Sequence, residues 1–194
     1  MSKKSISGEF VPKAALFCAE SFQRLGEQFI DNIGNIPEGS TQNFEVEFGN
    51  VVSSATNLAL ALEIYLKTLL NQLGQPIHKI HDLGKLYTDL PQKIKKEIED
   101  KYDKALHSLP ENTRVSITIA KGPYNTPIWK KHKSIEIAEL LKRSADVFVS
   151  WRYIFVYEPK ESDYEFHEFE YRLLVLACEA IKACILNHDK GNAS

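Results

Sequence analysis

The sequence predicts an all-α protein, an antiparallel bundle of four to six helices forming a single domain over residues 1–194. Two observations lead to this prediction. Apolar residues recur at intervals of three and four over most of the chain, which is the spacing of a helix with one buried face. A length of 194 residues with 43 % hydrophobic content also suffices for one sizeable core.

The first predicted helix spans residues 13–33 and is expected to pack on a core of about 44–186. Pro12 suits a first helical turn and Gly34 suits a stop. A loop is predicted over Asn35–Gly49, followed by a second helix from about Val51 to Leu73. We expect this second helix at the centre of the bundle, because its apolar residues form one stripe: Ala55, Leu58, Leu62, Leu66, Leu69 and Leu73.

The next segments alternate between helix and connector. Asp82 is expected to cap a short helix, and Pro91 to open the next one. Residues 108–133 contain three prolines around the β-like segment Val115–Ile119, so they predict a long irregular connector with room for one short strand. Further helices are predicted from Ser134 to Tyr157 and from Ser162 to Asn187. The last of these has more apolar surface than one bundle face requires, so we expect a homodimer through it.

Charge and cysteine content limit the classes of partner. Lys and Arg number 24 against 26 Asp and Glu, a net charge of -2, so an anionic partner must be bound locally rather than by an overall basic field. The three cysteines, Cys18, Cys178 and Cys184, lie in apolar helical patterns typical of reduced, buried thiols. No window approaches the roughly 20 apolar residues of a membrane span. We expect a cytoplasmic protein with no membrane partner and no cofactor.

Two blocks of sequence resemble a known family. One contains LALEIYLKTLL, a glycine and then HDLGKLYTDLP, and the other is FVSWRYIFVYE. Together they resemble the HEPN (higher eukaryotes and prokaryotes nucleotide-binding) domains, over about Phe44 to Leu186. The resemblance implies a helical bundle, often dimeric, associated with RNA or nucleotides and with partner proteins in bacterial defence, toxin-type or nucleotide-transfer systems. Many active members of that family cut RNA without a metal.

The chain departs from the HEPN ribonuclease pattern, in which a histidine follows an arginine after four to six residues on a late helix. There the arginine holds the scissile phosphate and the histidine moves the proton of the 2′-hydroxyl. No arginine of this chain has a histidine at that interval, and the first histidine after Arg152 is His167. We therefore expect a nucleic-acid- or nucleotide-associated binding or assembly module. The alternative is a metal-independent RNA endonuclease that uses Arg152 and His167.

Glu63 interrupts the apolar stripe of the second helix. On a helical wheel it lies beside Ala59, Leu66 and Leu70, so its carboxylate is expected to turn inward, where it needs a cation. The sequence offers Arg152 from a distant helix and Lys67 one turn away. Two interpretations stay open: a structural pair within the bundle, or an anion- or nucleotide-binding pocket. The residues of such a pocket would be Glu63, Lys67, Arg152 and Tyr153.

One further motif suggests metal-dependent chemistry. His81 and Asp82, in HDLGK, resemble the metal-binding core of the HD phosphohydrolases. No histidine precedes His78, so the further histidine such a site needs on an earlier helix is missing, and a helix cap at Asp82 is the main expectation.

Basic and aromatic residues are concentrated between Lys121 and Arg143. Such residues can follow a nucleic-acid backbone and stack on bases, although a solvated surface is the alternative. The candidates for a nucleic-acid surface are Lys121, Trp129, Lys130, Lys131 and Lys133.

Overall fold

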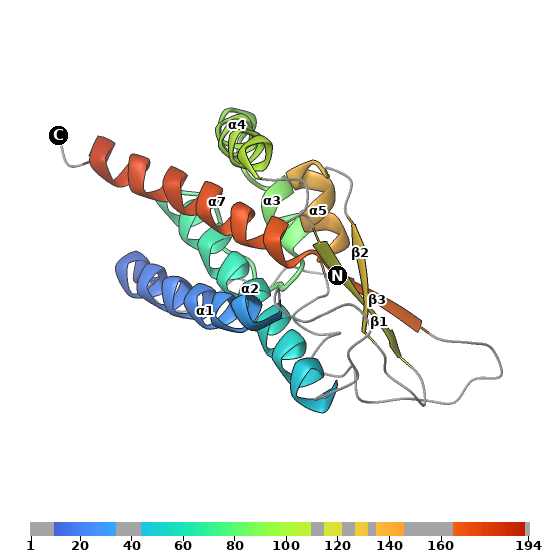
Figure 1. The fold of residues 1–194 in the computed structure, drawn as a ribbon. Helices are drawn as coiled ribbons and strands as arrows, with labels where there is room; N and C mark the ends of the chain where they lie inside the picture. The colour runs from blue at the N-terminus through green and yellow to red at the C-terminus, as the bar shows by residue number, and fades with distance from the viewer. Residues whose placement is uncertain are drawn as a thin grey trace.

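The computed structural model of the chain describes residues 10–33, 44–109, 115–121, 127–131, 135–145 and 165–192 (Figure 1). Within these residues the helices are α1 (Pro12–Ile33), α2 (Phe44–Gln72), α3 (Leu83–Thr88), α4 (Gln92–Ser108), α5 (Ile137–Arg143) and α7 (Tyr171–Asn192). The strands are β1 (Val115–Lys121), β2 (Pro127–Lys131) and β3 (Glu165–Phe169).

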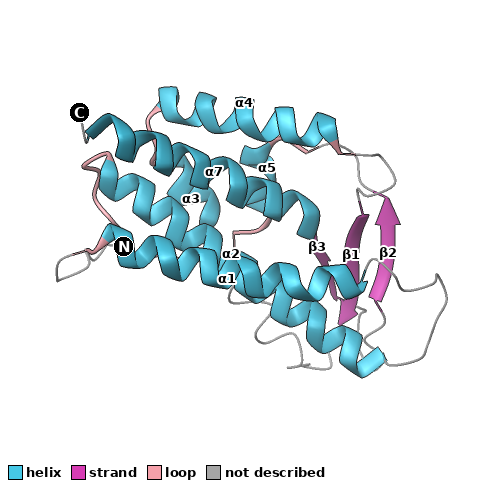
Figure 2. Ribbon diagram, turned by 60° about the vertical axis from the view of Figure 1, so that its left-hand side comes forward, coloured by secondary structure: helices cyan, strands magenta, loops and turns pink. Residues whose placement is uncertain are grey.

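The predicted helical bundle is confirmed, and α2 lies at its centre (Figures 1 and 2). Helix α2 packs against α1 and α7, while α4 lies along α7 and α3 packs on α5. The predicted apolar stripe of α2 is buried along most of its length, and its members Leu58, Leu62, Leu66 and Leu69 have no exposed surface. This burial explains why the helix tolerates so few polar residues.

Helices α1 and α2 approach closely at Gly26. The Ser54 hydroxyl donates to the Gly26 carbonyl oxygen at 2.7 Å, joining the two helices directly. A Cβ atom added at Gly26 would lie 2.7 Å from Leu58 Cγ, so this contact requires a residue without a side chain. The predicted first helix is thus confirmed as α1. The predicted start of the second helix is wrong, because α2 begins at Phe44 and takes up part of the predicted loop.

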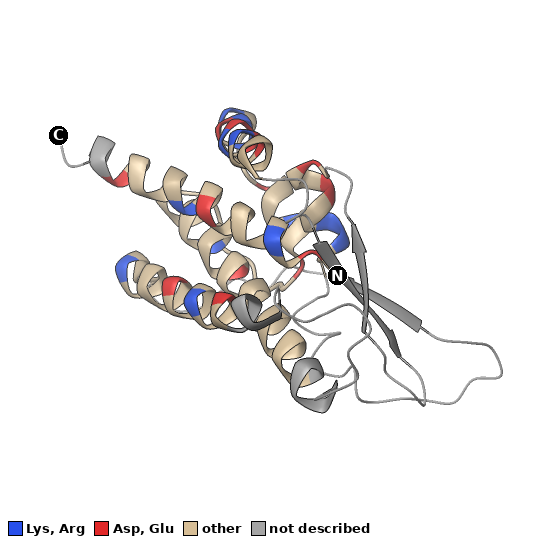
Figure 3. Ribbon diagram, in the orientation of Figure 1, with Lys and Arg blue, Asp and Glu red and all other residues tan. Residues whose placement is uncertain are grey.

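The ends of α2 and α3 follow the expected capping rules. Gly74 adopts a φ of 66°, and the Gln75 amide donates to the Leu70 carbonyl at 2.9 Å, which satisfies the last carbonyls of α2. Asp82 caps α3 by accepting a hydrogen bond from the Lys85 amide at 2.9 Å, as predicted. The buried side of α4 is also as expected from its spacing: Ile94, Ile98, Tyr102 and Leu106. Basic and acidic residues occupy much of the rest of this helix (Figure 3).

The prediction of an all-α bundle omitted one element, because a small antiparallel sheet with the strand order β2-β1-β3 accompanies the helices. Strands β1 and β2 occupy most of the described part of the predicted irregular connector. Strand β3 occupies residues 165–169, so the final helix begins at Tyr171 instead of Ser162. Alternation in Val115–Ile119 favours a strand, but its partner β3 lies far along the chain, and local spacing cannot reveal such a pairing.

The helix predicted from Ser134 to Tyr157 is confirmed only as α5, Ile137–Arg143, and residues 146–164 lie outside the described residues. The apolar surface of α7, on which the predicted homodimer depended, is largely covered by α2 and α4 within the chain. Its buried residues include Leu173, Leu174, Ala177, Ile181 and Ile185. None of the helices in the described ranges is long and apolar enough to span a bilayer.

Candidate functional site

Glu63 turns inward, as predicted, and is only 5 % exposed. Its Oε1 atom lies 2.6 Å from Lys67 Nζ, one helical turn along α2. Its Oε2 atom lies 2.9 Å from His81 Nδ1, in the connector between α2 and α3. Lys67 is therefore a cation partner of this carboxylate. The other candidate cation, Arg152, and the candidate pocket residue Tyr153 lie outside the described residues.

Both carboxylate oxygens of Glu63 are thus engaged from different directions. An ionised carboxylate can only accept hydrogen bonds, so the His81 Nδ1 atom donates in this contact. The Lys67 side chain is 12 % exposed and its charge is balanced by Glu63, which leaves it poorly suited to attract an external anion. The cluster of Glu63, Lys67 and His81 therefore ties α2 to the chain that leads into α3, and this geometry fits a structural role.

His81 and Asp82 are adjacent in sequence but have different partners. Asp82 Oδ2 lies 2.7 Å from Lys85 Nζ, in addition to the cap contact. Burial alone would raise the pKa of Asp82, but hydrogen bonds from the Lys85 side chain and amide outweigh it and lower the pKa. Among the described residues, no group of three His, Cys, Asp or Glu side chains could hold a metal ion.

The sheet brings together several of the nucleic-acid candidates by its backbone register. Trp129 pairs with Ile117, Lys131 with Val115, and His167 with Ile119. Since positions two apart along a strand share a face, the positions of Trp129, Lys131 and His167 lie on one face of the sheet.

Lys121 of β1 belongs to the same face, four positions from Ile117 and paired with Glu165. Lys130 occupies the opposite face by alternation, and Lys133 lies outside the described residues. Apolar positions share this face, namely Val115, Ile117 and Ile119 of β1 and Phe169 of β3, and Phe169 is only 1 % exposed. We call it the Trp129 face.

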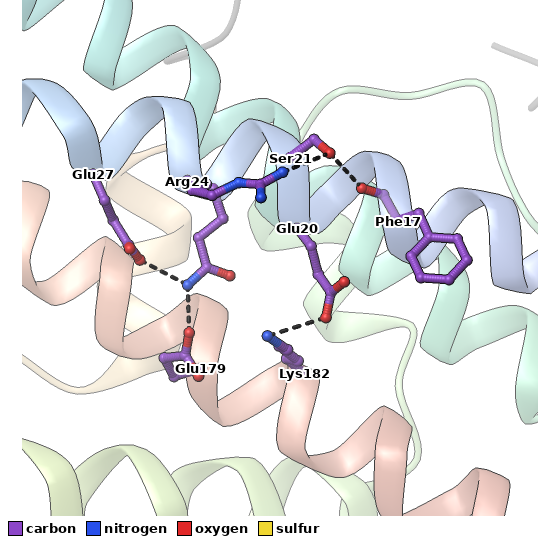
Figure 4. A pocket seen from close by; sticks show the side chains of 8 residues that line it. Phe17, Glu20, Ser21, Arg24, Glu27, Glu179 and Lys182 are labelled. Atoms are coloured by element: carbon purple, nitrogen blue, oxygen red, sulfur yellow. Dashed lines mark hydrogen bonds and ion pairs between the residues drawn. The ribbon is translucent and has the colours of Figure 1, made fainter.

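Sequence reasoning missed a cavity of about 450 Å³ between α1 and α7 (Figure 4). Gln23, which is 5 % exposed, forms its floor: the side-chain amide donates to Glu27 Oε1 at 2.8 Å and also to Glu179 Oε1. Tyr65 of α2 donates from below to Gln23 Oε1 at 2.7 Å. Nothing in the sequence signals this arrangement, because Gln23 and Glu179 are separated by most of the chain.

The buried groups beneath this cavity are neutral. Burial, with the nearby Cys178 and carboxylates adding to it, raises the pKa of Tyr65 well above its usual range. Burial likewise raises the pKa of Cys178 far above the usual thiol value. The expectation of a buried thiol is confirmed for Cys178 and Cys184 but is wrong for Cys18, which is exposed on α1.

No protein-family model matches this chain, and neither a curated protein nor a solved structure matches it. The functional argument therefore depends on the sequence blocks and on the geometry above.

Proposed function

We propose that this protein is a HEPN-like module that binds single-stranded RNA through the Trp129 face of its sheet. The observation that carries the proposal is the register, which gives Lys121, Trp129 and Lys131 positions on the same face. Phe169 of β3 is buried on that face, so the proposed contact with RNA is at its β2 edge. Lysines neutralise phosphates and an aromatic ring offers a stacking platform, and single-stranded nucleic acid requires both. The proposed setting is a bacterial defence or toxin-type system with a dimeric protein, which the HEPN resemblance implies, and the proposed cytoplasmic location comes from the cysteine content.

The contacts of Glu63 argue against an anion-binding pocket on α2 and favour the sheet as the RNA-binding surface. Lys67 would have to release Glu63 to hold a phosphate, and this would leave a buried carboxylate with one cation fewer. The proposed binding residues are therefore those of the sheet, and Glu63 and Lys67 are assigned to the framework of the bundle.

The binding test is fluorescence anisotropy with labelled oligouridine and oligoadenine RNA over a series of salt concentrations. Lys121→Ala and Lys131→Ala should each weaken binding to both RNAs and lower the salt slope by about 0.7. Trp129→Ala should weaken binding about ten-fold, as expected for one lost base stack. The matched control is Lys96→Ala, because Lys96 is exposed on α4 and paired with Asp100. Absence of RNA binding by the unmodified protein would refute the proposal.

A second candidate function is a metal-independent RNA endonuclease that uses Arg152 and His167. The position of His167 supports it, because the register gives His167 the same face of the sheet as Trp129 and Lys131. Labelled RNA incubated with a metal chelator should then be cut by the unmodified protein but not by Arg152→Ala or His167→Ala. His107→Ala is the control, since His107 is exposed on α4. RNA that binds but stays intact would leave only the binding function.

A further inference from the structure

The cavity between α1 and α7 is lined by residues of these two helices and by none of the sheet, and its two ends differ in charge (Figure 4). Gln23 contacts Glu179, and Glu20 pairs with Lys182 at 3.1 Å. From the first of these contacts to the second, the residue number decreases in α1 and increases in α7. The two helices are therefore antiparallel, and they form the walls of a groove. We call it the α1–α7 groove.

One end of the groove is anionic. The carboxylates of Glu27 and Glu179 share a single neutral donor, the Gln23 amide, and so lie close together. Within the described part of the chain neither carboxylate has an ion-pair partner, whereas Glu20 is paired with Lys182. Two neighbouring carboxylates repel each other, and a cation placed between them would remove that cost.

The other end of the groove combines an aromatic ring with polar groups. Arg24 also lines the cavity, and its guanidinium donates to Ser21 Oγ at 3.4 Å, one turn from Phe17 (Figure 4). Phe17 lines the cavity and is 56 % exposed, although it is one of the largest apolar residues of α1. Extending the antiparallel pairing along α7 brings Leu186, which is 40 % exposed, toward the same end. Exposed apolar side chains that flank a cavity are typical of surfaces that bind a partner.

We infer that the α1–α7 groove binds a short amphipathic segment of a partner protein, which places an arginine or lysine side chain between Glu27 and Glu179 and an apolar side chain against Phe17. Charge complementarity selects this occupant, because Arg24 contacts Ser21 and not the two carboxylates, so an acidic or purely apolar segment would leave them uncompensated. The floor is already organised, since Tyr65 holds Gln23 and Gln23 holds both carboxylates in the unbound chain.

The probe is a phage-displayed library of random dodecapeptides, selected on the immobilised full-length protein and followed by calorimetry with the enriched peptides. We expect sequences that combine Arg or Lys with Leu or Phe. Glu179→Gln keeps an acceptor for Gln23 but removes the charge, and should weaken binding about ten-fold. Phe17→Ser should weaken it similarly through lost apolar contact.

The matched controls are Glu139→Gln, an exposed carboxylate on α5, and Leu25→Ser, an exposed apolar residue of α1 that does not line the cavity. Each should change the dissociation constant by less than about two-fold. Circular dichroism establishes that every variant is folded. The inference is overturned by a selection without enrichment, by peptides that lack basic residues, or by equal affinity for Glu179→Gln. It is also overturned if light scattering finds that the groove joins two copies of this chain.

Discussion

His81 Nδ1 lies 2.9 Å from Glu63 Oε2, so a histidine of the connector after α2 contacts a buried carboxylate of that helix. Lys67 approaches the other oxygen of the same carboxylate from within α2. The contact fixes the direction in which the chain leaves α2, because the Asp82 cap follows directly after His81.

Replacing Glu63 should destabilise the protein. Glu63→Ala leaves the mostly buried side chain of Lys67 without this partner, and we expect the free energy of unfolding to fall by about 2 to 3 kcal/mol. The double replacement Glu63→Leu with Lys67→Leu should restore much of this loss, since apolar residues of similar volume fit the interior. Urea denaturation followed by circular dichroism measures both. Equal stability of Glu63→Ala and the unmodified protein would contradict the buried pair.

Gly26 should not tolerate a methyl group. An alanine there would place its Cβ 2.7 Å from Leu58 Cγ, and relieving this overlap should cost about 1 to 3 kcal/mol, partly offset by the better helix propensity of alanine. We therefore expect a lower melting temperature for Gly26→Ala. Gly49→Ala is the matched control in α2, where nothing lies within 4 Å of an added Cβ. It should leave stability unchanged or raise it by up to about 1 kcal/mol.

The Asp82 cap of α3 should make the stability of the protein depend on pH in the acid range. The pKa of Asp82 is lowered in the folded chain, so its contribution is complete above the unfolded aspartate pKa of about 3.9 and disappears as the pH falls through the folded value. Asp82→Ala should thus cost about 1 kcal/mol at neutral pH and progressively less in acid. Asp82→Asn, which still accepts a hydrogen bond without a charge, is the control. Unfolding titrations over this pH range test it, and a pH-independent cost would contradict the assignment.

The cysteines should differ in reactivity. Cys18 is exposed on α1, whereas burial raises the pKa of Cys178 well above normal and that of Cys184 to about 12. A thiol reagent such as dithionitrobenzoate should therefore modify one cysteine rapidly in the folded chain and all three after unfolding in denaturant. Cys18→Ser should abolish the rapid phase. Rapid modification of a second thiol would indicate that α7 is less well packed than the structure describes.

The spacing of residues in the sequence correctly predicted those structural features that depend on neighbouring residues. The stripe of α2, the Asp82 cap and the inward turn of Glu63 each follow from contacts within one or two helical turns. His81 could not be identified as a partner of Glu63, because its position depends on the path of the connector after Gly74. Hydrophobic spacing gives no information about contacts between segments that are distant in the sequence. The pairing of Ile117 with Phe169 and the contact of Gln23 with Glu179 are of this kind.

The central position of α2 has a consequence for synthesis. This helix is completed at Gln72, but α7, which covers one of its apolar faces, is the last helix of the described chain. A ribosome-bound chain would therefore carry an uncovered leucine surface while nearly a hundred further residues are added. Chaperones that hold apolar helices should engage the nascent chain during that interval, and truncation before Tyr171 should lead to aggregation.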